Sequence, residues 1–129
     1  MRDFKNLEVW CKSHQLTLNV YRATEGFPRS ELFGLTSQIR RAASSIEANL
    51  AEGCGRSQAE FARFVQIAVG SNCELECHLL LSRDLTLLSG ESYRRLIGGV
   101  EEVRRMLNAL LKRIRTTEVA GTTQAHSTA

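Results

Sequence analysis

Apolar residues recur along most of this chain at alternating spacings of three and four, the periodicity of helices that pack lengthwise against one another. The clearest repeat lies between Leu32 and Gly53 and contains one polar residue, Asn49. Its members are Leu32, Leu35, Ile39, Ala42, Ile46, Asn49 and Gly53. The sequence has one proline and no alternating run of Val, Ile and Thr bounded by turn residues, so it predicts no strand.

Four helices are predicted in this way, and short breaks that contain glycine separate them. The predicted helices cover residues 7–24, 29–52, 58–88 and 91–114. Ser57 and Glu60 form a Ser-x-x-Glu capping box at the start of the third helix. Because short connections join antiparallel neighbours, we expect an all-α, up-down-up-down four-helix bundle over residues 1–114. The tail, residues 115–129, has no periodicity and is predicted to be disordered.

One stripe of each remaining helix is predicted to face the core. In the first helix the stripe is Leu7, Trp10, His14, Leu18 and Tyr21, with Val9, Leu16 and Val20 beside it. In the third helix it is Phe61, Phe64, Ala68, Ser71, Leu75, His78, Ser82 and Leu85. In the fourth helix it is Tyr93, Leu96, Val100, Val103, Leu107, Leu110 and Ile114.

The second helix has another face, built mainly from small side chains. Its members are Ser37, Arg41, Ser44, Ala48 and Ala51. Small side chains let a second backbone approach closely, so we expect this face to contact another subunit. Asn49 is expected to fix the register of packing, as a polar residue in an apolar seam does. The alternative for Asn49 is that it faces a groove and bonds a nearby helix-end carbonyl.

Composition adds modest constraints. A chain of 129 residues is about one domain, and a net charge of +3 permits binding to a polyanion without requiring it. Its cations are 14 Arg and 3 Lys; Arg suits bidentate contact with phosphate, although the composition of a GC-rich genome also explains the excess. The N-terminus lacks the apolar core of a signal peptide, and no apolar run approaches the roughly 20 residues of a membrane span. We therefore expect a cytoplasmic protein whose cysteines are thiols.

A series of landmarks through most of the chain resembles one bacterial protein family. The landmarks are Leu7-Glu8-Val9-Trp10, Val20-Tyr21, Phe27-Pro28, Glu31, Gly34-Leu35, Gln38-Ile39-Arg40-Arg41-Ala42-Ala43, Ser45-Ile46, Asn49-Leu50-Ala51-Glu52-Gly53, Arg56, Glu60-Phe61, Phe64, Ile67-Ala68, Gly70-Ser71 and Glu74-Leu75. Their order, between Phe4 and Ile114, resembles the four-helix-bundle proteins encoded in intervening sequences of bacterial 23S ribosomal RNA genes. It is also similar to the accessory variability proteins of diversity-generating retroelements.

This resemblance implies an antiparallel four-helix bundle that assembles as a ring, usually a homopentamer. Through the retroelement relatives it also implies a role beside a reverse transcriptase and RNA. The partners expected from it are further copies of this chain and either RNA or a nucleic-acid-processing protein.

Basic residues are the functional candidates that the pattern leaves. The nucleic-acid-binding candidates are Arg40, Arg41, Arg56, Arg63, Arg104, Arg105, Lys112 and Arg113. Acidic neighbours such as Glu47, Glu101 and Glu102 also favour the plainer interpretation of a solvated face of mixed charge. In a ring, however, symmetry multiplies a weak patch, and its phosphate contacts add through avidity. No aromatic residues alternate with these charges, so base-specific reading of a single strand is not expected.

Other chemistry is weakly indicated. Cys73, Cys77 and His78 lie close enough in sequence to suggest a metal site, but a small apolar filler is the commoner role of such cysteines. Gly53-Cys54-Gly55-Arg56-Ser57 opens a helix, where backbone N–H groups can hold phosphate; a two-glycine turn with a Ser cap explains it as well. No Cys–His pair with an orienting group and no paired carboxylates stand out. We therefore predict no catalytic residue, no metal and no cofactor.

The sequence predicts a non-enzymatic, homo-oligomeric bundle that acts as an adaptor for structured RNA, including ribosomal RNA, or for a nucleic-acid–protein complex. The alternative is a protein-binding scaffold with no nucleic-acid role. Neither membrane association nor a small-molecule substrate is expected.

Overall fold

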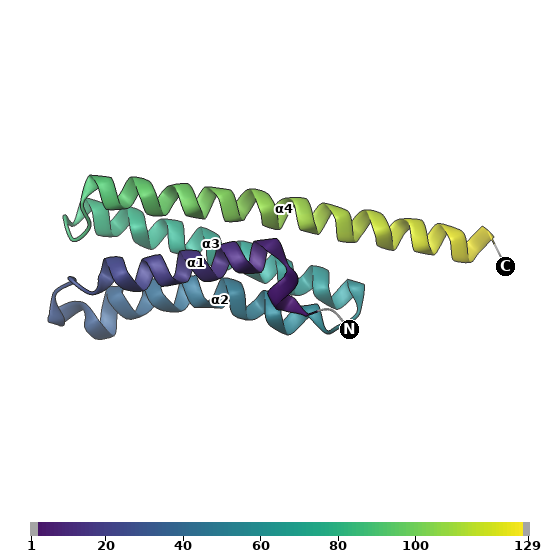
Figure 1. The fold of residues 1–129 in the computed structure, drawn as a ribbon, viewed down its shortest axis with the longest axis horizontal. Coiled ribbons are helices and arrows are strands. Elements are labelled where there is room, and N and C mark those ends of the chain that lie inside the picture. The colour runs from purple at the N-terminus through teal and green to yellow at the C-terminus, as the bar shows by residue number, and fades with distance from the viewer. Residues whose placement is uncertain (1–2, 128–129) are drawn as a thin grey trace.

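The computed structural model describes residues 3–127, with side chains up to Thr117, and this part is a bundle of long helices without strands. The helices are α1 (Glu8–Thr24), α2 (Ser37–Cys54), α3 (Gln58–Asp84) and α4 (Gly90–Ser127). Short turns alternate between the two ends of the bundle, and α4 returns to pack beside α1 as well as α3 (Figure 1). The all-α fold class and the four-helix bundle are confirmed for the described residues.

All four helices contribute to a single core. Its fully buried apolar side chains include Val20, Ile39, Ile46, Leu50, Phe61, Val65, Leu75, Leu79, Val100 and Leu107. Burying one such side chain stabilises the fold by about 1.5–3 kcal/mol relative to leaving it in water. The predicted stripe of α4 lies in this core from Leu96 to Ile114, and the seam of α2 lies in it from Leu35 to Gly53, with Asn49 half-buried.

Helix α1 is rotated relative to the prediction. His14, Leu18 and Tyr21 of the predicted core stripe are exposed. The apolar residues on the buried face are Val9, Leu16 and Val20, which the sequence placed beside the stripe.

Three hydroxyl side chains complete the buried face of α1 and explain the error. Ser13, Thr17 and Thr24 each donate to the backbone carbonyl four residues earlier, at 2.7, 3.0 and 2.9 Å. A hydroxyl bonded within its own helix turn can be buried without leaving a polar group unsatisfied. A count of apolar residues gives such positions no weight, so it selected the wrong face.

The predicted second helix does not begin as a regular helix at residue 29. A 3₁₀ turn (Arg29–Glu31) and a π-helical turn (Leu32–Thr36) precede α2, and Gly34 interrupts them with φ −112° and ψ −112°. The Glu31 side chain accepts a hydrogen bond from the Leu35 N–H at 3.4 Å, which caps the π-helical turn, whereas α2 has Thr36 at its N-cap and no side-chain cap. Leu32 is therefore turned outward and does not begin the buried seam.

The turn between α2 and α3 brings two helices into close contact. Ser57 caps α3 as predicted, because its hydroxyl oxygen accepts from the Glu60 N–H at 3.3 Å. Gly53 is buried, and a Cβ atom placed on it would lie 2.6 Å from the Cβ of Phe64. No other residue fits there without displacing α3.

Helix α3 ends at Asp84, earlier than the predicted boundary at residue 88. Thr86 follows with a positive φ of 59°, and the Leu87 N–H donates to the Ser82 carbonyl at 2.9 Å. This is the left-handed cap that usually selects glycine at the position of Thr86.

Helix α4 continues beyond Ile114 to Ser127, where the sequence predicts a disordered tail (Figure 1). Ile114 is the last buried side chain among those described. Extending a helix that already exists needs no new nucleus, and no proline follows Ile114 to stop it. Helix α4 therefore extends beyond the last of the buried side chains described in the bundle core.

Candidate nucleic-acid interface

The predicted cations fall into two groups, those bound within the fold and those left exposed. Arg40 belongs to the first group. Its Nε donates to Thr24 Oγ1 at 2.9 Å and its Nη2 to the Tyr21 carbonyl at 3.3 Å. Its guanidinium also lies 4.7 Å from the centre of the Tyr21 ring. Arg40 thus satisfies the carboxyl end of α1 and joins it to α2, which is a structural role.

Arg104 is bound in the same way between α3 and α4. Its Nε donates to Asn72 Oδ1 at 2.8 Å, and its Nη2 donates to Glu76 Oε1 at 2.5 Å. Asn72 is fully buried and donates through Nδ2 to the Val100 carbonyl at 3.1 Å. The buried Asn72 amide is bonded at both its oxygen and its nitrogen, and Arg104 beside it is paired. These bonds fix the register in which α3 and α4 pack.

The sequence singled out Asn49 for such a register role and missed Asn72. Asn49 is half-buried, and its Nδ2 donates to the Ser45 carbonyl of its own helix at 2.8 Å and to Ser45 Oγ at 3.0 Å. Ser45 Oγ in turn bonds Ser71 Oγ of α3 at 2.9 Å. Asn72 had no sequence signal of its own, because it directly follows the predicted seam position Ser71.

Arg56 lies between two carboxylates at the α2–α3 turn. It pairs with Glu52 at 2.9 Å and with Glu60 at 3.3 Å. Hydrogen bonds to Glu52 first, and then to Glu60, raise the pKa of Arg56 above its ordinary value. Its guanidinium lies 5.3 Å from the centre of the Phe64 ring. The segment considered as a phosphate loop therefore already contains its own counter-charges.

The remaining candidates are exposed and have no ion-pair partner among the described side chains. They are Arg41, Arg63, Arg105, Lys112 and Arg113. Arg41 lies on the outer face of α2 and Arg63 near the start of α3. Arg105 and Lys112 are seven residues apart, so they lie on one face of α4, away from the buried stripe. These five cations are spread over three helices of the chain.

The predicted small-residue face of α2 lies toward the outside of the bundle. Ala48 and Arg41 are exposed, whereas Ser37, Ser44 and Ala51 are half-buried. Among the described residues this face is less covered than the core side, where Ile39, Ala43 and Ile46 are fully buried.

The sequence did not predict an aromatic cluster that lies on the surface where α1 packs against α2. The rings of Trp10 and His14 stack with centroids 4.9 Å apart, and Phe4 meets Trp10 edge-on at 5.0 Å. His14 Nδ1 lies 2.8 Å from Glu47 Oε2. This contact joins α1 to α2 across the surface, where His14 is exposed.

The cysteine cluster lies at the surface. Cys73 and Cys77 are exposed thiols, so the prediction that they fill the core is wrong. His78 is half-buried and contacts Glu74 at 3.3 Å within α3. In the described part of the chain, no group of three or more His, Cys, Asp or Glu side chains is arranged to hold a metal ion. Nor is any helix there long and apolar enough to cross a membrane.

Comparisons with known proteins identify the family. The sequence model of the 23S rRNA-intervening sequence proteins matches residues 5–109. A crystal structure from Bacteroides thetaiotaomicron, described as a protein with unknown function from the S23 ribosomal protein family, is similar with a TM-score of 0.72. It is 25% identical in sequence, and the match covers 81% of this chain and 98% of that one. No curated protein matches significantly. Since the family model spans most of the sequence, this chain belongs to the 23S rRNA-intervening sequence protein family.

Proposed function

We propose that this protein is a non-enzymatic adaptor that binds structured RNA, with ribosomal RNA as the first candidate, through its exposed cations. The observation that carries the proposal is that Arg41, Arg63, Arg105, Lys112 and Arg113 are exposed and unpaired among the described side chains. Each is free to contact a phosphate without first breaking an internal bond. The name of the family, which refers to 23S rRNA, supports the same ligand class. The proposal includes a cytoplasmic location, where ribosomal RNA is found.

Self-association is the second part of the proposal. Five cations spread over three helices bind RNA weakly as one copy, whereas a ring of copies repeats them at fixed spacing and gains avidity. The small-residue face of α2 supports a contact between subunits, with Asn49 setting register and a homopentamer as the expected assembly. Phe33, 95% exposed in the isolated chain at the entry to α2, supports it as well.

A relation to the retroelement accessory proteins, and hence a reverse-transcriptase partner, is also part of the proposal.

The test is RNA binding by a triple variant, Arg41→Glu, Arg105→Glu and Lys112→Glu. We expect the wild-type protein to bind a folded 23S rRNA fragment with an affinity that falls steeply with salt. The triple variant should bind at least about 100-fold more weakly, because each lost phosphate contact also removes released counterions. Arg40 and Arg104 are left unchanged, since reversing them would break the contacts between helices.

A charge-matched control separates specific contacts from net charge. The variant Arg29→Glu, Arg94→Glu and Arg115→Glu changes the same number of exposed cations that are not candidates. It should lose much less affinity than the first variant. Equal losses would mean that RNA binds by overall charge alone, and no binding by the wild-type protein at low salt would reject the RNA proposal. Sedimentation showing only monomer at micromolar concentration would reject the oligomer.

A protein-binding scaffold is the second candidate function, and Phe33 favours it. A fully exposed Phe beside the half-exposed Leu32 is costly in water unless a partner covers it. This function predicts that a protein partner is recovered with the tagged chain after nuclease treatment and is lost from a Phe33→Ser variant. Recovery that disappears with nuclease would favour the RNA adaptor.

A further inference from the structure

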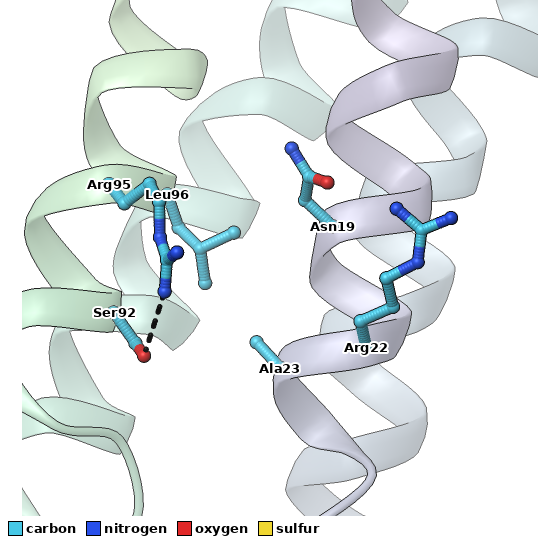
Figure 2. A pocket seen from close by; sticks show the side chains of 6 residues that line it. All are labelled: Asn19, Arg22, Ala23, Ser92, Arg95 and Leu96. Atoms are coloured by element: carbon cyan, nitrogen blue, oxygen red, sulfur yellow. Dashed lines mark hydrogen bonds between the residues drawn. The ribbon is translucent and has the colours of Figure 1, made fainter.

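The seam between α1 and α4 contains a hollow that neither the RNA proposal nor the subunit contact uses. Its volume is about 460 Å³. Its lining residues are Asn19, Arg22 and Ala23 of α1 and Ser92, Arg95 and Leu96 of α4. Figure 2 shows Arg95 on the α4 wall, with its guanidinium directed toward Ser92, and Arg22 on α1, with its guanidinium directed along α1 rather than toward Arg95. Each helix thus contributes one Arg to the lining, and the exposed side chain of Arg22 can turn into the hollow when an anion binds.

The positive charge of this hollow is not neutralised by its surroundings. No carboxylate lines it, and Arg22 has no ion-pair partner among the described side chains. Among the described residues, the side-chain hydrogen bond of Arg95 is a long contact with a neutral group, 3.5 Å to Ser92 Oγ. A smaller adjoining hollow of about 120 Å³ does contain a carboxylate, Glu102, but Glu102 pairs with Lys12 at 3.2 Å.

We propose that this hollow binds the terminal phosphoryl group of a phosphate monoester. A phosphate monoester carries close to two negative charges at neutral pH and three acceptor oxygens, which matches two guanidinium groups. Asn19 and Ser92 offer further hydrogen-bond donors, and Ala23 with Leu96 offers an apolar wall to the organic part. The volume lies in the range of small-ligand sites, about 300–1,000 Å³. The sequence predicts no small-molecule substrate. The proposed occupant is a bound ligand rather than a substrate, because the lining of the hollow includes no catalytic side chain.

Two sources can supply such a group, a free mononucleotide or the 5′ end of an RNA strand. The site is independent of the proposed RNA contacts, because Arg22 and Arg95 are not among the five cations that carry them. Failure of the charge-reversal test above would leave this site in place, and failure here would leave the RNA adaptor in place.

The experiment is a titration of the full chain followed by amide chemical shifts and calorimetry. The probes are adenosine 5′-monophosphate, adenosine, and one short oligoribonucleotide with a 5′-phosphate or a 5′-hydroxyl. We expect adenosine 5′-monophosphate to bind with a dissociation constant of about 0.1–1 mM and to shift the amides around Arg22 and Arg95. Adenosine should not bind. Arg22→Gln and Arg95→Gln should each weaken binding about tenfold or more, the usual loss for one charged hydrogen bond.

Arg94→Gln is the matched control, because Arg94 is exposed on the same turn of α4 but does not line the hollow. It should bind as the wild type does, and circular dichroism should show equal helicity in all three variants. Binding of the 5′-phosphorylated RNA at least tenfold tighter than the mononucleotide identifies an RNA end as the source; equal affinity identifies a free monoester. The proposal is overturned if phosphate makes no difference to binding, or if Arg94→Gln weakens it as much as Arg22→Gln.

Discussion

The α2–α3 contact and the α1–α4 seam are two helix pairs of one bundle, yet they pack in opposite ways. At the first, Gly53 lets α2 approach so closely that a Cβ atom would lie 2.6 Å from Phe64, and Ser45 bonds Ser71 across the interface. At the second, hollows of about 460, 120 and 180 Å³ follow one another between the helices. The difference shows that the α2–α3 contact is closely packed, whereas the α1–α4 seam retains space lined in part by polar side chains.

The same substitution at the two contacts gives the largest expected effect. Gly53→Ala places a Cβ atom against Phe64 and should destabilise the fold by about 2–3 kcal/mol, the cost of overpacking a tight contact. In Gly99→Ala, the added Cβ atom would lie 3.1 Å from Cδ1 at the end of the Leu16 side chain, in the open seam. There Leu16 can move, and the gain in helix propensity of up to about 1 kcal/mol should leave stability unchanged or raised. Urea unfolding measures both changes.

The two results must differ in size for the comparison to hold. If Gly99→Ala costs as much as Gly53→Ala, the α1–α4 seam is packed as tightly as the α2–α3 contact. The adjoining hollow of about 120 Å³, which Gly99 lines, is then closed in solution.

A smaller effect tests the α3–α4 contact, which adjoins the open seam. Arg104→Met removes the partner of Asn72 Oδ1 and Glu76 and should cost about 1–2 kcal/mol in free energy of unfolding. Arg105→Met, its neighbour in sequence, should change stability by less than about 0.5 kcal/mol, because Arg105 is exposed. Equal losses from the two variants would show that the Asn72 contact does not hold these helices together.

The smallest effect comes from the turn between α3 and α4. Thr86→Gly should raise the free energy of unfolding by about 0.5–1 kcal/mol, because glycine adopts the positive φ of this position without steric cost. The gain should leave the binding of adenosine 5′-monophosphate unchanged, since Thr86 lines no part of the hollow. Thermal unfolding followed by circular dichroism gives the sign of the stability change. A lower melting temperature would contradict backbone strain at Thr86.

Sequence periodicity predicted α4 well and α1 poorly, for a physical reason. The buried stripe of α4 from Leu96 to Ile114 is purely aliphatic, so the pattern and the core coincide. In α1, three buried positions are Ser or Thr residues bonded to their own helix, and the aromatic residues lie at the margin. The pattern there indicates a helix but not its orientation.

The candidate site was predictable only as a set of charges. Arg40 and Arg104 are structural because their partners lie on other helices, 16 and 32 residues away in the chain. Local sequence carries no information about such partners. The hollow was equally hidden, since Arg22 and Arg95 become neighbours only when α4 returns beside α1.

The adjacent pairs Arg40–Arg41 and Arg104–Arg105 have a consequence for how related sequences diverge. One step along a helix turns a side chain by about 100°, so selection acts differently on each member of a pair. Arg40 and Arg104 should persist in any relative that keeps this bundle, whatever it binds. Arg41 and Arg105 are constrained only by the molecules that bind the surface. Relatives that have changed partners should therefore lose these two residues first. Retention of the outer member, rather than of the pair, is therefore the mark of a shared ligand.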